Sequence, residues 1–172
     1  MAVANGSLVE SLVAEFSEEV GITRRTLDRV PADKLAWRPH AKSMTLGQLA
    51  MHVATIPGGI SRLLQQDSFD VSQGNFVPPQ PKSKEEILGA YDQSARDGEA
   101  FLSGLSDDRA DSRWRLEKSG QELFTRRRIE VVRSIMLNHW YHHRGQLSVY
   151  LRLLDVPLPV IYGRSADEDP FA

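Results

Sequence analysis

Two histidines near the end of the chain have the spacing of metal ligands. His139 and His143 are four residues apart in a stretch with helical periodicity. Side chains at positions i and i+4 of a helix lie on one face, about 5–6 Å apart at Cβ. Both imidazoles could therefore reach one divalent cation. His142 would be rotated by about 100° from His143 on the same helix, so we expect it to point elsewhere.

A third imidazole comes from an earlier segment. His52 lies beside Leu49 and Ile56, at the edge of an apolar stripe. Three imidazoles from two facing helices would leave at least one coordination position of a metal ion open, as in catalytic rather than closed structural sites. The spacing alone also allows each histidine to be a hydrogen-bonded core residue. Imidazole binds zinc, nickel, copper and iron, and zinc or nickel is the favoured cofactor.

Other polar residues have simpler interpretations. Gln48 lies one turn before His52 and could orient its ring, since metal-bound imidazoles usually donate their second N–H to a partner. Arg144 and Gln146 are expected to pack and to form hydrogen bonds where helices cross. The run Arg126–Arg128 is most simply a solvated face. No catalytic residue can be assigned, because no carboxylate is marked by the sequence as a general base.

The segments that must position these residues are helices. Apolar residues recur every three or four positions in four stretches, which predicts helices over about 8–30, 45–64, 83–105 and 125–154. Capping-box pairs open the first three, at Ser7, Thr45 and Ser83. Pro57-Gly58-Gly59 interrupts the second stretch, but the apolar period continues beyond it, so a kink is expected rather than an end.

The last helix shows an apparent core face that includes the histidines. Its members are Val132, Ile135, His139, His143, Leu147, Tyr150 and Leu154. Before this helix, residues 114–124 could form a small hairpin. The sequence therefore predicts an all-α fold, a four-helix bundle with a possible small hairpin before the last helix.

Composition excludes several classes of protein. At 172 residues the chain should form one domain, spanning 1–172. The absence of cysteine excludes disulfides, thiolate zinc fingers, iron–sulfur clusters and a cysteine nucleophile. A formal charge of −2 argues against nucleic acid as a partner. The chain has neither a membrane-length apolar stretch nor a signal-peptide pattern, so we expect no membrane partner and a cytoplasmic location.

Several motifs resemble those of one family. Residues 137–147 resemble the H-x-x-x-H-R-G-Q signature of the DinB/YfiT-like proteins, and residues 37–39, 44–52, 150–152 and 156–159 resemble the segments around it. The resemblance spans nearly the whole chain. It implies an up-down-down-up bundle, often a homodimer, that binds a divalent metal through His52, His139 and His143.

Two classes of function follow from these observations. The first is an enzyme, a metal-dependent hydrolase or a thiol transferase, acting on a small-molecule substrate with or without a low-molecular-weight thiol. The second is a non-catalytic protein, stabilised by its metal, that binds a small ligand or a partner in a stress response. For the homodimer, Trp114, Phe124 and Trp140 are candidate interface aromatics, although Trp114 and Phe124 could equally pack onto their own bundle.

Overall fold

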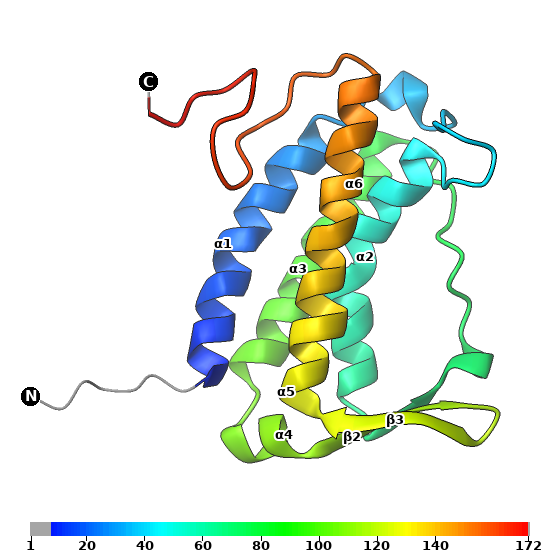
Figure 1. The fold of residues 1–172 in the computed structure, drawn as a ribbon, viewed down its shortest axis with the longest axis vertical. Coiled ribbons are helices and arrows are strands. Elements are labelled where there is room, and N and C mark those ends of the chain that lie inside the picture. Colours follow the sequence, from blue (N-terminus) through cyan, green and yellow to red (C-terminus); the bar gives the residue numbers. More distant parts are fainter. Residues whose placement is uncertain (1–7, 172) are drawn as a thin grey trace, which may run out of the picture.

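Four long helical segments lie side by side in the computed structural model, which describes residues 8–171 (Figure 1). They are α1 (Leu8–Asp28), α2 (Leu46–Leu64), α3 (Lys84–Ser103) and a last run made of α5 (Arg128–Val131), the π-helical segment η3 (Val132–Asn138) and α6 (His139–Leu153). Both α1 and α2 pack against α3 and against α6. The predicted helices are therefore confirmed, whereas their up-down-down-up order stays a prediction.

Short elements connect these helices. They are η1 (Ala32–Lys34), β1 (Ser68–Asp70), η2 (Val71–Gln73), α4 (Asp107–Asp111), β2 (Arg113–Lys118) and β3 (Gln121–Arg127). The predicted cap of α2 is confirmed: the Thr45 hydroxyl accepts from the Gln48 N–H at 3.1 Å, and the Gln48 side chain accepts from the Thr45 N–H at 3.0 Å. Ser83 likewise caps α3. The predicted cap at Ser7 lies outside the described residues.

A small sheet corrects the all-α prediction. The hairpin is present as β2 and β3, and β1 pairs in parallel with β2, so the protein is mostly helical with a three-stranded sheet. Because β3 runs to Arg127, the last helical run begins at Arg128 rather than at 125. A strand of three residues is too short to show an alternating pattern, which explains why the sequence did not indicate β1.

The carboxylate of Asp70 joins β1 to the hairpin turn. Ser119 and Gly120 both have positive φ, 50° and 78°, as expected for a tight two-residue hairpin turn. Their N–H groups donate to Asp70 at 2.9 and 3.2 Å. Hydrogen bonds from the side chain and backbone of Ser72, followed by those from the turn, lower the pKa of Asp70 to about 2. Asp70 therefore ties the end of β1 to the turn between β2 and β3.

Arg128 contradicts the prediction that Arg126–Arg128 form a solvated face. Its side chain is fully buried. The guanidinium donates to the carbonyls of Leu64 and Gln66, at 2.8 and 2.9 Å, and pairs with Asp67 at 2.9 Å. A cation at the C-terminal end of α2 satisfies carbonyls that have no helical partner. Arg127, by contrast, is half-exposed and pairs with surface carboxylates.

The Pro57-Gly58-Gly59 run lies within α2, which continues to Leu64. Pro57 has no N–H to donate to the carbonyl of Val53, and the indole of Trp140 donates there instead, at 2.9 Å. Gly58 lies against α3, where its N–H donates to the hydroxyl of Ser94 at 2.8 Å. A Cβ on Gly58 would lie 2.9 Å from the Ser94 Cα, whereas a Cβ on Gly59 would have nothing within 4 Å.

The aromatics considered for a dimer interface are mostly internal. Trp140 is fully buried, and Trp114 is buried and packs against Phe124, with ring centroids 6.2 Å apart. Neither tryptophan can serve an interface, and the homodimer itself stays a prediction. Within residues 8–171, no helix combines the length and apolar character needed to span a membrane.

The two neighbouring glycines should respond oppositely to alanine. We expect Gly58→Ala to lower the free energy of unfolding by about 1–3 kcal/mol, because the added methyl group meets the backbone of α3. Gly59→Ala should raise it by up to about 1 kcal/mol, because alanine favours the helix and meets no atom. Urea unfolding followed by circular dichroism measures both. Equal effects would contradict the described contact between α2 and α3.

Candidate metal centre

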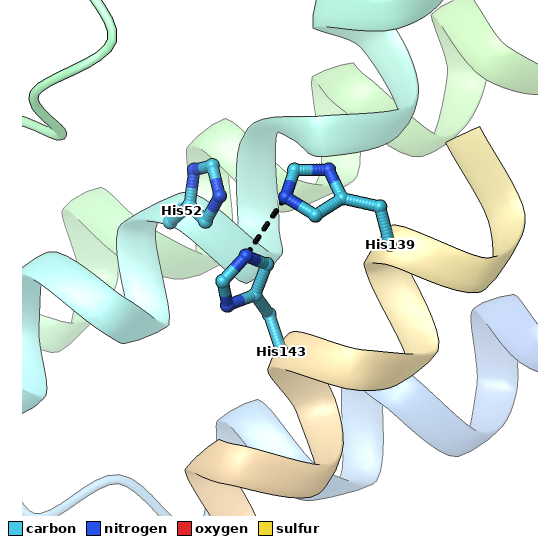
Figure 2. Close-up of side chains that lie close together, drawn as sticks. All are labelled: His52, His139 and His143. Atoms are coloured by element: carbon cyan, nitrogen blue, oxygen red, sulfur yellow. Dashed lines mark hydrogen bonds between the residues drawn. The ribbon is translucent and has the colours of Figure 1, made fainter. Parts of the chain in front are cut away.

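His52, His139 and His143 lie together between α2 and α6. Figure 2 shows their rings turned toward one another, His52 from α2 and the other two from successive turns of α6. One ring nitrogen from each lies within 4.8 Å of the others, and the Nε2 atoms of His139 and His143 are 2.8 Å apart. Among residues 8–171, this is the one cluster of three or more His, Cys, Asp or Glu side chains close enough to share a metal ion.

The face of α6 that enters the core is shifted from the predicted one, although both include Leu147. The buried residues of α6 are Trp140, Arg144, Leu147 and Leu151. His139 and His143 each lie one position before a core residue and are half-buried at the edge of the core. The predicted stripe is therefore displaced by about one residue, or about 100° around the helix. The histidines border the core rather than replace leucines within it.

A buried charge explains why the sequence pointed to the wrong face. Arg144 occupies a core position, and its guanidinium pairs with the carboxylate of Glu19 on α1 at 2.5 Å and donates to the hydroxyl of Thr23 at 2.8 Å. Because a charged residue occupies this buried position, the apolar residues of the core face do not recur at regular helical intervals in the sequence. The predicted role of Arg144, packing and hydrogen bonding where helices cross, is confirmed.

The helix immediately before His139 is π-helical. Residues Val132–Asn138 form the segment η3, in which each turn holds more residues than an α-turn. Such segments are rare and often occur at functional sites. The wider turn changes the rotational phase between Val132 and His139, so a single 3.6-residue period cannot describe the whole run. This is the second reason why the predicted face was displaced.

Hydrogen bonds orient one of the three rings. The Nδ1 of His143 lies 2.7 Å from Oε1 of Gln146, which assigns its proton to Nδ1 and leaves the Nε2 lone pair facing the other histidines. Gln48 does not orient His52, because its side chain closes the cap of α2 and donates to the carbonyl of Pro78. His142 is exposed, as expected.

Burial keeps the three imidazoles neutral. It lowers the pKa of His52 to about 4, and the neighbouring His143 and His139 add to the shift. Burial also lowers the pKa of His139 and of His143, opposed by the Ile135 carbonyl in the first case and by Gln146 in the second. Neutral imidazoles are the form that binds metals. At neutral pH the cluster therefore presents uncharged nitrogen donors.

The donor set fits a divalent transition metal. Three nitrogen ligands suit zinc, nickel, copper or iron, and a compact group of imidazole nitrogens satisfies the ligand count of catalytic zinc sites. No carboxylate or fourth histidine of residues 8–171 joins the group. The residues present can therefore hold a metal ion and leave a coordination position for a ligand from solution.

A pocket of about 520 Å³ opens beside the histidines. His52 and His139 contribute to its wall, and most of the remaining wall is apolar. The wall combines α2 with the segment between α2 and α3, strand β2 and the start of the last helical run. The sequence did not indicate this pocket, because its aromatic residues Phe69, Phe76 and Trp114 come from irregular segments and short strands.

Known proteins resemble this chain along nearly all of its length. The protein YrdA of Bacillus subtilis (strain 168), described as uncharacterized, is 25% identical over 162 residues, which cover 93% of this chain and 91% of YrdA. The crystal structure of a DinB-like protein, YjoA, from Bacillus subtilis has a TM-score of 0.68 at 18% identity, covering 90% of this chain and 99% of that one. A DinB-like protein from Bacillus cereus ATCC 10987 has a TM-score of 0.66 at 21% identity, covering 89% and 97%.

The two solved structures share the fold with this chain. The sequence comparison goes further, because a model of the DinB family matches residues 1–169. That match includes the three clustered histidines and the helices that carry them. The chain belongs to the DinB family.

Proposed function

We propose that the protein is a metal-dependent enzyme that acts on a small molecule, with His52, His139 and His143 as the ligands of one divalent ion. The observation that carries the proposal is the cluster of three imidazoles, two of which also line a pocket large enough for a small molecule. A structural metal site would need no such pocket. Zinc and nickel are the proposed metals.

The reaction we favour is transfer of a low-molecular-weight thiol. When bound, a divalent ion lowers the pKa of a coordinated thiol or water and polarises a carbonyl. Hydrolysis is usually assisted by a general base that removes a proton from water. None of the described residues that line the pocket is a carboxylate that could act as this base. A divalent ion held by the three histidines would favour the thiolate form of a thiol, whose proton would pass to solvent, so thiol transfer would need no such carboxylate. Hydrolysis of a small molecule is the second candidate reaction.

Metal content tests the assignment of the ligands. We expect one zinc or nickel ion per chain in the purified protein, and its loss in His52→Ala, His139→Ala and His143→Ala. Metal that binds only the native state stabilises it, by about 2.7 kcal/mol when free metal is at 100 times its Kd. The same three variants should lose this metal-dependent stabilisation. Elemental analysis and thermal unfolding with and without metal measure the two effects.

His142→Ala is the matched control. It removes an adjacent histidine that is exposed and lies outside the cluster, so its metal content should equal that of the wild type. Loss of metal from this variant alone would show that the assigned face of α6 is wrong. Unchanged metal content in all four variants would overturn the metal site.

The metal-free protein should become less stable as the pH falls from about 6.5 toward about 4. The folded-state pKa of His52 is about 4, below its ordinary value of 6.5, so the unfolded chain takes up protons first. The neutral ring therefore stabilises the fold fully above pH 6.5, and this contribution is lost on acidification. Thermal unfolding of wild type and His52→Gln checks the sign. The difference between them should change over this range; a constant difference would contradict the burial of a neutral imidazole.

An open coordination position on the metal ion would distinguish an enzyme from a non-catalytic protein that the metal only stabilises. Cobalt(II) can replace zinc and gives a sulfur-to-metal charge-transfer absorption when a thiolate binds. We expect this absorption when 2-mercaptoethanol is added to the cobalt-loaded wild type, with one thiol bound per metal. An unchanged spectrum would indicate a closed metal site and favour the non-catalytic alternative.

A further inference from the structure

The pocket beside the histidines contains almost no charge. Apart from His52 and His139, its one ionisable side chain among the described residues is Arg62. Arg62 is 64% exposed, and its guanidinium lies 3.2 Å from the carboxylate of Asp97. It therefore belongs to the rim and is already paired. Burying an unpaired charge in such a pocket would be costly.

Aromatic and aliphatic side chains form the remaining wall. Phe69 and Phe76 meet edge to face, with ring centroids 6.3 Å apart, on the side of the segment between α2 and α3. Trp114 lies on β2, the strand that pairs with β1, and its indole N–H donates to the carbonyl of Leu63 at 3.3 Å. Because this hydrogen bond uses the polar atom of the indole, Trp114 contributes only apolar ring surface to the pocket. The wall favours an uncharged aromatic or aliphatic group.

Gly59 leaves space within this pocket. It lies seven residues, about two turns, after His52 on the same side of α2, and it lines the pocket. A Cβ at this position would have no atom within 4 Å. Glycine within a helix is less favourable than alanine by about 1 kcal/mol. Packing explains the glycine at position 58, but no contact explains the one at position 59, whose missing side chain keeps the pocket open.

We propose that this pocket binds an uncharged, apolar part of the substrate, such as an aromatic ring or a branched hydrocarbon, and that Gly59 sets the size it accepts. The reacting group of the substrate lies at the His52 and His139 end. Its placement there rests on the proposed metal-dependent function, whereas the binding of an apolar group by the pocket does not.

A neutral fluorescent probe tests the pocket without metal. N-phenyl-1-naphthylamine is uncharged and aromatic, and its fluorescence increases in apolar surroundings. We expect saturable binding to the metal-free wild type and a Kd at least about 10-fold weaker for Gly59→Leu, because the leucine side chain fills the space.

Gly89→Leu is the matched control. Gly89 also lies within a helix, and a Cβ there also meets no atom within 4 Å, but it is exposed on α3 and outside the pocket. Its Kd for the probe should stay within about twofold of the wild type. Both variants should unfold at or above the wild-type temperature, since leucine is the better helix former. Equal Kd values for Gly59→Leu and the wild type, or no saturable binding to the wild type, would overturn the proposal.

Two hydroxamates distinguish binding by the apolar pocket from binding by the metal ion. Acetohydroxamate can bind an open metal position, and 4-phenylbutanohydroxamate adds an uncharged aromatic group. In the zinc-loaded wild type we expect the second to bind at least about 10-fold tighter, an advantage that Gly59→Leu removes and Gly89→Leu keeps. Binding of acetohydroxamate without this advantage would overturn the pocket proposal alone. Binding of the neutral dye without binding of acetohydroxamate would support the pocket and count against the proposed function.

Discussion

The carbonyl of Val53 depends on another helix for its hydrogen bond, because the residue four positions later is Pro57. The indole of Trp140 donates to it at 2.9 Å from a fully buried position. This bond joins the two helices that carry the histidines, next to His52 on one and next to His139 on the other. A buried polar group without a partner costs about 1–3 kcal/mol. Sliding one helix along the other would leave both groups unpaired, so this bond helps fix the separation of the imidazoles.

Arg144 fixes the rotation of α6 in a similar way. Its guanidinium is buried and paired with Glu19 on α1. The preceding residue, His143, is half-buried and faces α2. Turning the helix to bring His143 into the core would separate the ion pair and leave Glu19 as an uncompensated buried charge, which is strongly destabilising. The helix therefore presents two faces, one held by an ion pair against α1 and one that offers imidazole nitrogens and a wall of the pocket.

The sequence predicted the elements whose signal is local. Helical periods and the cap at Thr45 were sufficient for the long helices, and the spacing of His139 and His143, with the family resemblance, identified the three clustered histidines. It did not predict features that depend on distant partners. Arg128 is buried because its guanidinium donates hydrogen bonds to carbonyls at the end of α2. The predicted core face of α6 was displaced from the observed one, because a buried arginine and a π-helical segment interrupt the helical pattern of apolar residues. Strand β1 and the pocket depend on long-range contacts that leave no periodic pattern.

The central claim is that three imidazoles hold one divalent ion with an open position toward the pocket. Anomalous scattering from a crystal of the zinc-loaded protein, measured on both sides of the zinc absorption edge, tests it most directly. We expect one peak per chain, with His52, His139 and His143 at about 2.0–2.1 Å and no fourth protein ligand. A peak elsewhere, or a fourth side chain that closes the coordination shell, would contradict it.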